Sequence, residues 1–392
     1  MPHRTWPKQS FQFAFFFFAY YAYVGAFTPY ASLYFVDKGI CAGEIGILMS
    51  LMQVTRIFGP NLWGWMADHM QQRVVVLRVT AVAALLVFSG MFVGTGFIQF
   101  FALMLLLNTC TSAQGPLSEA LMLSEMQGDL TQYGRLRLWG SVGFILAVTC
   151  GGKLLDWQGI SLMPWLCWGL LGLVLLASLW MQESPHEIVH HALPSVRMLL
   201  LRPEVSAFFT STFMMVAAHS ALYVFYSLYL AQLGYNKTVI GLMWSLGVVA
   251  EIVFFYFQAP IFRRFGIKTL MLASLIIAIG RFLMLGLGAQ SLICLLFAQI
   301  LHAATFAAHH SASVLRMQRW FSGPLQARGQ ALYISISYGL GGSFGGLLLS
   351  LFWNDTNGRA VFFAAAMLAA IGWLAALLSY RWQDRALAIS TT

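Results

Sequence analysis

Eight charged or histidine side chains stand inside long apolar stretches of the sequence. They are Arg56, Glu119, His219, Glu251, Arg281, His302, His309 and His310. A charge in the middle of a bilayer costs roughly 3 kcal/mol or more, so each such group should face a partner or a water-filled cavity. Carboxylates, arginines and histidines with apolar neighbours influence one another's protonation, which suits a pathway for a solute and a proton. The alternative is static charge pairing that only holds helices together.

Two of these residues are related by position. Arg56 and Glu251 coincide when the sequence is shifted by 195 residues, and their charges are opposite, so we expect them to form a state-dependent pair. His309 and His310 are adjacent, so on a helix at most one of them points at a cavity, and the sequence favours neither.

The composition identifies the solvent of the chain. Of its 392 residues, 59% are hydrophobic and 9% are charged, whereas a water-soluble domain usually carries about a quarter charged residues. Such a composition cannot cover a water-facing surface, so the chain is expected to lie in a lipid bilayer. Five scattered cysteines without a C-x-x-C pair predict neither a disulfide framework nor a metal site. Without a Walker A motif or a nucleophile–base set, no cofactor and no enzyme activity are expected.

Apolar stretches long enough to cross a bilayer, about 20 residues each, occur in two groups of six. The first group covers 11–36, 43–67, 74–97, 98–124, 138–156 and 160–181. After a polar break at 182–203, the second group covers 205–233, 237–261, 268–287, 290–314, 328–352 and 357–380. The pattern predicts an all-α membrane protein with twelve transmembrane helices.

The distribution of lysine and arginine predicts the orientation. Sixteen of these residues fall in segments on the side of the N-terminus, against four in the opposite loops: Lys38, Lys153, Lys237 and Arg359. The positive-inside rule therefore places both termini in the cytoplasm. The net charge of +9 thus reflects orientation in a membrane, and no nucleic-acid partner is expected.

The two groups of helices also repeat in sequence. At the shift of 195 residues, Ser32-Leu33-Tyr34 falls on Ser227-Leu228-Tyr229, and Ile45-Gly46 falls on Ile240-Gly241. The period is half the chain, so the halves are expected to be structural duplicates with parallel topology, related by a pseudo-two-fold axis. Duplicated six-helix bundles place a solute cavity at their interface and alternate its access by rocking, so the repeat predicts transport.

The loop after the second expected helix, Gly64-Trp65-Met66-Ala67-Asp68-His69-Met70-Gln71-Gln72-Arg73, resembles the G-x-x-x-D signature of the major facilitator superfamily. The resemblance implies that Asp68 caps and pairs at a cytoplasmic helix end. It also implies gating or structural roles for Asp68, Arg73 and Arg56. Gln71 and Gln72 replace the later glycine and first basic residue of that signature.

A second resemblance spans Gly115-Pro116-Leu117-Ser118-Glu119-Ala120 and Tyr133 to Gly143 and is to the lactose-permease branch. In that branch a glutamate and an arginine eighteen residues later engage the substrate, which implies this role for Glu119 and Arg137. The ring-stacking position of the branch is occupied by Phe144. Of the aromatic residues that crowd 11–34, we expect an inward-facing minority, such as Tyr23, to stack on a ring-shaped solute.

In the second half, Ala250-Glu251, Gly280-Arg281 and Gln299-Ile300-Leu301-His302 look closest to the phenylpropionate-permease group of bacterial transporters. The resemblance implies that Glu251, Arg281 and His302 belong to a proton-coupling network. The branch has a proton-carrying glutamate three residues after this histidine, where Thr305 stands here. Glu251 and Glu119 are therefore both candidates for the proton carrier, with His302 as a relay.

Together these patterns predict a proton-coupled symporter for a small organic solute such as an aromatic carboxylate. The predicted domains are 1–181, a six-helix bundle; 182–203, a cytoplasmic linker; and 204–392, a second six-helix bundle. Its expected partners are the solute, protons and lipid, and it is expected to act as a monomer in a bacterial inner membrane. Symport of a sugar or nucleoside, or proton-driven export, is the alternative. A membrane-embedded enzyme or an open channel fits the buried opposite charges less well.

Overall fold

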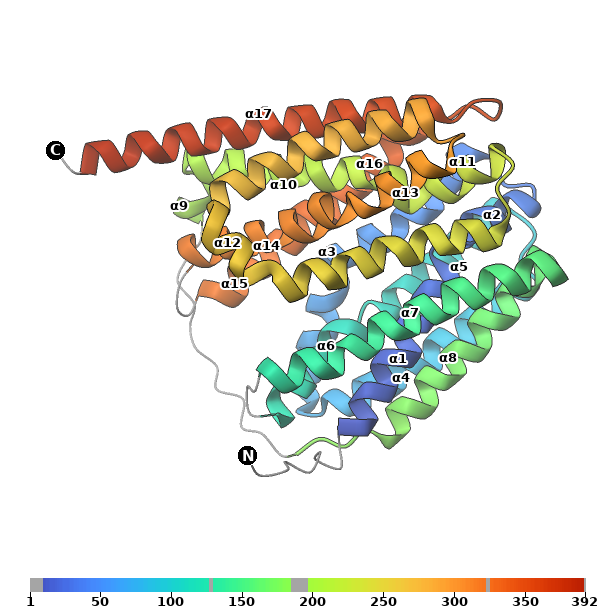
Figure 1. Cartoon of the computed structure of the whole chain (residues 1–392). Coiled ribbons are helices and arrows are strands. Elements are labelled where there is room, and N and C mark those ends of the chain that lie inside the picture. The colour runs from blue at the N-terminus through green and yellow to red at the C-terminus, as the bar shows by residue number, and fades with distance from the viewer. Residues whose placement is uncertain (1–9, 127–129, 185–196, 322–324, 391–392) are drawn as a thin grey trace. The chain divides into compact units, whose positions relative to one another are not determined.

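The computed structural model describes residues 10–126, 130–184, 197–321 and 325–390, and every regular element in these ranges is a helix (Figure 1). The first ten are α1 (Ser10–Phe27), α2 (Ala31–Asp37), α3 (Ala42–Met70), α4 (Arg73–Phe88), η1 (Ser89–Phe92), α5 (Phe97–Thr111), α6 (Gln114–Glu125), α7 (Leu130–Gln158), η2 (Ile160–Leu162) and α8 (Met163–Trp180). The others are α9 (Arg197–Leu200), α10 (Pro203–Ser220), η3 (Ala221–Tyr226), α11 (Ser227–Gln232), α12 (Lys237–Gly288), α13 (Leu292–Ile300), η4 (Ala303–Ala308), α14 (His309–Trp320), α15 (Gln326–Tyr333), η6 (Ile334–Gly341), α16 (Gly342–Ser350) and α17 (Arg359–Ser390).

Ten helices in the described ranges are long and apolar enough to cross a membrane. Nine of them each overlap one expected span, and α12 overlaps two. With 52 residues, α12 is far longer than the hydrocarbon core of a bilayer requires, and its backbone leaves helical geometry at Gly266, where φ is 73°. The remaining expected span corresponds to α3, which is not among the ten. An all-helical, multi-pass membrane protein is confirmed, while the count of twelve and the two-fold relation stay predictions.

The chain divides into two compact units, which are described here one at a time. Unit 1 comprises Met1–Glu44, Phe58–His190 and Asn236–Ser245, and unit 2 comprises Ile45–Ile57, His191–Tyr235 and Leu246–Thr392. Most of the predicted linker, 182–203, lies outside the described residues. The predicted domain boundaries at 181 and 204 therefore stay predictions.

In unit 1, α1 packs against α7 and α8, and α4 packs against α5 and α8. Glycines bring α1 and α7 together, as small residues commonly do between membrane helices. A Cβ added at Gly25 would lie 2.6 Å from the carbonyl oxygen of Phe144, and one at Gly143 would overlap the carbonyl of Phe18. This close approach sets the aromatic side chains of α1 against the face of α7 that carries Arg137.

At the other end of α7, the carboxylate of Asp156 caps the first turn of α12. Its Oδ1 accepts a hydrogen bond from the backbone N–H of Lys237 at 2.9 Å. Its Oδ2 accepts from the backbone N–H and the hydroxyl of Thr238 at 2.8 and 2.5 Å. A carboxylate here satisfies N–H groups that lack a partner within the helix and lies at the favourable end of the helix dipole. The capped segment belongs to unit 1.

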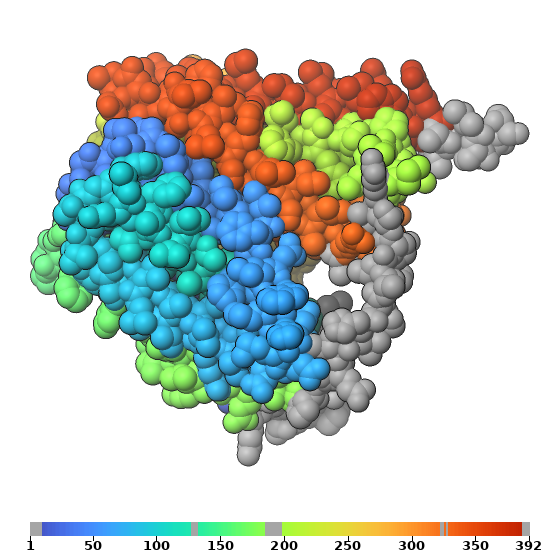
Figure 2. Space-filling model, turned by 180° about the vertical axis from the view of Figure 1, so that it is seen from behind, coloured from blue at the N-terminus to red at the C-terminus, as the bar shows by residue number. Residues whose placement is uncertain are grey.

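The outer surface of unit 1 is strongly apolar. Large exposed apolar side chains on α3, α4 and α5 include Leu62, Trp65, Val79, Leu86, Ile98 and Leu106. This part of the chain forms the blue-to-cyan surface in Figure 2. A surface of this kind is expected of helices that face lipid rather than water.

In unit 2, α10 packs against α16, α17 and η6. Three of the membrane-crossing helices of this unit contain a π-helical segment: η3 interrupts Pro203–Gln232, η4 interrupts Leu292–Trp320, and η6 interrupts Arg328–Ser350. A π-helix closes its hydrogen bonds one residue later than an α-helix and so changes the direction of the side chains around it. Such segments are often found at functional sites.

Candidate functional site

Glu119 on α6 and Arg137 on α7 form an ion pair in unit 1. Nε of Arg137 donates to Oε1 of Glu119 at 3.0 Å, and the two side chains are 31% and 34% exposed. A partly exposed pair of this kind remains accessible to a solute. No acceptor lies on Nη1 of Arg137 among the described residues, so this end of the guanidinium can donate to a bound molecule.

Tyr21, which the sequence analysis did not single out, holds Arg137 from a second side. Its hydroxyl oxygen accepts a hydrogen bond from Nη2 at 2.6 Å, and its ring centroid lies 4.0 Å from Cζ. Gly140 leaves the space for this arrangement, because a Cβ there would lie 2.6 Å from the Tyr21 ring and 2.9 Å from Nη1. The ring of Phe17 lies 5.8 Å from the same Cζ. The guanidinium is thus enclosed by aromatic rings and one carboxylate.

Phe144 and Tyr23 are placed differently from this pair. Phe144 lies on α7 with a half-buried side chain, and its backbone packs against Gly25. Tyr23 is 4% exposed and stacks on Phe27 at 5.7 Å between ring centroids, with the edge of Phe88 at 6.3 Å. Tyr23 is a core residue of unit 1 in this structure, and the predicted solute contacts of both residues stay predictions.

Arg281, on α12 in unit 2, is fully buried. It donates to the Ala298 carbonyl at 2.6 Å, to Nδ1 of His302 at 2.9 Å, to Oγ1 of Thr305 at 3.0 Å and to Oε1 of Gln299 at 3.3 Å. A buried guanidinium must have its donors satisfied. Neutral acceptors do this here, and within the described ranges no carboxylate contacts Arg281 directly.

His302 connects Arg281 to Glu251, whose Oε1 lies 2.8 Å from Nε2 of the imidazole. A guanidinium can only donate hydrogen bonds, so Nδ1 of His302 accepts and Nε2 carries the ring hydrogen. The result is a chain from a buried cation, through a neutral imidazole, to a carboxylate. His302 cannot take a second proton at Nδ1 while Arg281 donates to it. Glu251 is therefore the member of this chain that can gain a proton without breaking the contact between Arg281 and His302.

The residues expected to gate or to pair are reported individually. The guanidinium of Arg56 lies 6.0 Å from the ring centroid of Tyr338, in unit 2. The pairing of Arg56 with Glu251 stays a prediction. The side chain of Asp68 is exposed near the end of α3, where Gln71 ends the helix in a left-handed conformation with φ 53°. Arg73 is the first residue of α4, and its gating role, like that of Asp68, stays a prediction.

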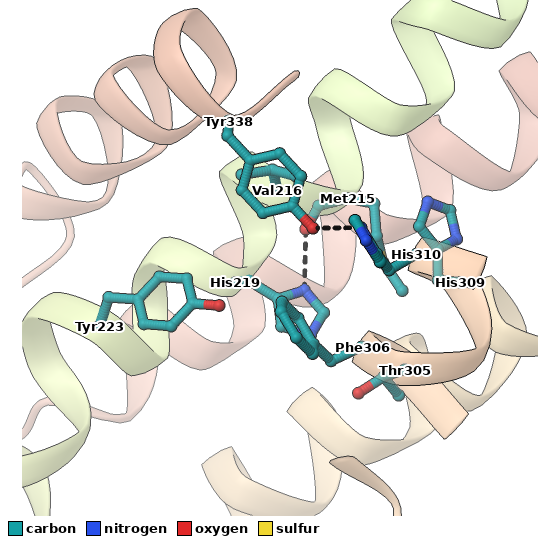
Figure 3. Close-up of a pocket in the computed structure, with 9 residues that line it drawn as sticks. All are labelled: Met215, Val216, His219, Tyr223, Thr305, Phe306, His309, His310 and Tyr338. Atoms are coloured by element: carbon teal, nitrogen blue, oxygen red, sulfur yellow. Dashed lines mark hydrogen bonds between the residues drawn. The ribbon is translucent and has the colours of Figure 1, made fainter. Parts of the chain in front are cut away.

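A small cavity lies in unit 2 where the three π-helices supply side chains (Figure 3). Its lining residues are Met215, Val216, His219, Tyr223, Thr305, Phe306, His309, His310 and Tyr338. Both adjacent histidines line it, but their partners differ. Nδ1 of His310 lies 3.0 Å from the Tyr338 hydroxyl, and Nδ1 of His309 lies 3.0 Å from the hydroxyl of Ser274.

Sequence reasoning missed a further cation. Arg78 of α4 donates to the carbonyl oxygens of Ser178, Leu179 and Met181 at 3.2, 3.2 and 2.9 Å. These carbonyls end α8, where a cation stabilises the helix dipole. An arginine within a turn of a helix start is a common orientation signal, so its sequence position alone did not indicate a cap.

The helices and the buried charge networks define a multi-pass membrane transporter rather than an enzyme. A family model described as "MFS_1 like family" matches residues 11–365, so the chain belongs to this family of the major facilitator superfamily.

The relatives are transporters throughout their length. The chain is 28% identical over 359 residues to the probable 3-phenylpropionic acid transporter of Escherichia coli (strain K12), covering 90% of this chain and 93% of the relative. It is 29% identical over 275 residues to the maltose permease of Geobacillus stearothermophilus, covering 69% and 68%. The crystal structure of the nucleoside transporter NupG superimposes with a TM-score of 0.81 at 18% identity, covering 95% and 99%. The family and its phenylpropionate-permease group, predicted from sequence, are confirmed, and the structural likeness shows the fold.

Proposed function

We propose that this protein is a proton-coupled symporter that imports a small aromatic carboxylate, of the 3-phenylpropionate kind, by alternating access. The chain of contacts Arg281–His302–Glu251 carries the proposal. It places one protonatable carboxylate at the end of a buried network whose other charged member, Arg281, is a permanent cation.

Proton coupling follows from the charge balance of this chain. With Glu251 ionised, its carboxylate accepts the Nε2–H of His302 and offsets the positive charge of Arg281. When Glu251 takes a proton, the charge of Arg281 is no longer offset and the hydrogen bond from His302 weakens. Burying an uncompensated charge is unfavourable, so the two protonation states favour different arrangements of the surrounding helices. A proton gradient can then bias the conformational equilibrium.

The surroundings of Arg137 support an aromatic carboxylate as the solute. A solute carboxylate can accept from Nη1, and its ring can pack against the aromatic side of α1. There Tyr20 and Tyr21 lie 5.0 Å apart between ring centroids, and Phe17 stacks near Tyr21 at 6.5 Å. The relative of 28% identity whose name gives 3-phenylpropionic acid as its solute supports the same class.

A neutral sugar or nucleoside is the second candidate, and a specific contact favours it. Glu119 already neutralises Arg137, so a neutral solute could bind both side chains without displacing either. An anion must instead compete with Glu119 or bind when Glu119 is protonated. The maltose permease and the nucleoside transporter among the similar proteins belong to this alternative. Proton-driven export would use the same groups in the opposite direction.

The remaining topology is proposed on the sequence patterns. Twelve membrane helices in two duplicated bundles, 1–181 and 204–392, are joined by a cytoplasmic linker at 182–203. Both termini face the cytoplasm of a bacterium, whose inner membrane holds the protein as a monomer. The excess of lysine and arginine on one side supports this orientation.

The test is a pH electrode in a weakly buffered suspension of de-energised cells that express the protein. 3-Phenylpropionate, maltose and uridine are added in turn, and empty-vector cells correct for passive entry of the weak acid. External alkalinisation with 3-phenylpropionate alone supports the proposal. Alkalinisation with maltose or uridine would replace the solute class, and acidification would indicate export. No response to any of the three contradicts the proposed symport of these solute classes.

A further inference from the structure

The cavity in unit 2 is the feature that the proposed function leaves unexplained. Each of the three π-helices contributes to its wall: Tyr223 from η3, Thr305 and Phe306 from η4, and Tyr338 from η6 (Figure 3). Its volume is about 10 Å³, which is close to the least that holds one water molecule. Hydroxyl and imidazole groups line it together with apolar side chains, so a water there would have polar partners.

His219 supplies an open acceptor in this wall. Its Nδ1 lies 2.9 Å from the carbonyl oxygen of Met215, one helical turn earlier. A carbonyl only accepts hydrogen bonds, so Nδ1 carries the ring hydrogen and Nε2 of the neutral ring has a lone pair. The side chain is 2% exposed, and Nε2 has no hydrogen-bond partner among the described residues. A buried acceptor of this kind is unfavourable unless water satisfies it.

The cavity also adjoins the buried charge network. Thr305 lines it, and the Thr305 hydroxyl oxygen accepts a hydrogen bond from Arg281 at 3.0 Å. The ring of His219 lies 6.0 Å from that of His302, measured between centroids. A water bound in the cavity would therefore lie beside the chain that ends at Glu251.

A direct route between the two nearest histidines of the α13–α14 span is blocked. The rings of His302, Phe306 and His310 stack at successive turns, 5.3 and 6.3 Å apart and within 10° and 9° of parallel. Phe306 therefore separates His302 from His310 and offers no proton-carrying atom. His219 lies to the side of this stack, 6.1 Å from the Phe306 ring, on the wall of the cavity. A path around Phe306 passes His219.

We propose that this cavity binds a water molecule hydrogen-bonded to Nε2 of His219, and that His219 and this water form a second proton-accepting station in unit 2. The water donates one O–H to Nε2 in the resting state. When an excess proton reaches the water, one O–H bond breaks and an N–H bond forms at Nε2, which leaves neutral water and an imidazolium. The Nδ1–H of His219 stays on the Met215 carbonyl throughout. The transport role rests on the proposed function, whereas the hydration of the cavity does not.

The groups that face this station determine how readily it is charged. Arg281 of α12 opposes a positive charge on His219, and Glu251 of the same helix favours one. His302, His309 and His310 are further titratable groups of the α13–α14 span, and Tyr223 and Tyr338 face the cavity from η3 and η6. The station is therefore expected to hold its proton transiently, while Glu251 is ionised.

The hydration is tested by hydroxyl-radical footprinting of the purified full-length protein in lipid nanodiscs in H₂¹⁸O, with oxidation located by mass spectrometry. Water trapped next to a buried methionine generates radicals that oxidise it. Met215, 1% exposed and lining the cavity, should be oxidised several times faster than Met104, which is 0% exposed in unit 1. Equal slow oxidation of both methionines would overturn the proposal.

The proton-accepting role is tested with three variants in the alkalinisation assay with 3-phenylpropionate. His219→Gln keeps a polar atom near the position of Nε2 but cannot carry an added proton, so Met215 oxidation should persist while solute-induced alkalinisation falls at least tenfold. His219→Leu should lose both. His69→Gln, at an exposed position, should lose neither. Unchanged alkalinisation in His219→Gln would remove the station, whereas silence of the unmodified protein would instead contradict the proposed function.

Discussion

Nη1 of Arg281 lies 2.9 Å from Nδ1 of His302, and this contact fixes which nitrogen of the imidazole carries its hydrogen. Because the guanidinium can only donate, Nε2 of His302 is left to donate to Glu251 at 2.8 Å. The histidine is thereby a fixed neutral bridge, and the protonation change falls on the carboxylate. This assignment separates the roles of two residues that the sequence resemblance grouped together.

Arg281→Lys should be disruptive although it keeps the charge. Lysine has three donors on a compact ammonium and cannot reproduce the planar fork that contacts four acceptors. An acceptor left unsatisfied in a buried site costs about 1–3 kcal/mol. We expect a lower melting temperature in detergent and loss of proton-coupled uptake. Arg263→Lys, at an exposed position, is the control and should match the unmodified protein. Full activity of Arg281→Lys would argue against the fixed neutral bridge.

Tyr21→Phe should weaken solute binding without removing it. The variant retains the ring that lies 4.0 Å from Cζ of Arg137 but loses the 2.6 Å hydrogen bond to Nη2. A less restrained guanidinium must be ordered by the solute, which corresponds to an about two- to tenfold weaker apparent affinity. Concentration-dependent uptake gives this value, and Tyr21→Ala should weaken it further. Tyr20→Phe, which loses only a 3.5 Å contact to the Thr111 carbonyl, serves for comparison. A larger effect at Tyr20 than at Tyr21 would contradict this view of the site.

Gly140→Ala should impair the same site by filling space. Its Cβ would lie 2.6 Å from the Tyr21 ring and 2.9 Å from Nη1 of Arg137, so both side chains must move. Gly134→Ala provides a matched control on the same helix, because a Cβ there meets nothing within 4 Å. That control should be neutral or stabilising by about 0.5–1 kcal/mol, the usual helix preference of alanine over glycine. We expect binding to be lost in the first variant and kept in the second. Equal binding by the two variants would refute the steric argument.

Asp156→Ala should destabilise the first turn of α12. It removes acceptors for two backbone N–H groups and a hydroxyl, and loss of an N-terminal cap typically costs about 1 kcal/mol. Asp156→Asn keeps an acceptor oxygen and should lose less. Melting of the purified variants, followed by tryptophan fluorescence, measures the difference. Identical melting of both variants and the unmodified protein would show that this cap contributes nothing.

Sequence patterns predicted the helical membrane class and the family, because apolar length and local signature residues are written directly in the chain. They also identified Glu119 and Arg137, which lie on consecutive membrane helices, and the structure places these side chains 3.0 Å apart. The same patterns placed Tyr23 at a solute site, whereas the structure packs it between Phe27 and Phe88. Aromatic content does not reveal which side of a helix meets a neighbouring helix.

Other features depend on geometry that hydropathy does not encode. A π-helix differs from an α-helix by a shift in hydrogen bonding, so η3, η4 and η6 could not be read from apolar residues. The direction of the hydrogen at His302 and at His219 depends on partners far away in sequence or on a local carbonyl. Tyr21 was one of many aromatic residues in the first helix until its contact with Arg137 distinguished it.

The central claim is that Glu251 carries the coupled proton, and Glu251→Gln in proteoliposomes tests it most directly. Glutamine can still accept the hydrogen bond from His302 but cannot be deprotonated or protonated. We predict that the variant keeps exchange of labelled for unlabelled 3-phenylpropionate across the membrane, yet shows no accumulation under an imposed pH gradient. Uphill accumulation equal to that of the unmodified protein would contradict the account and assign the coupled proton to another group.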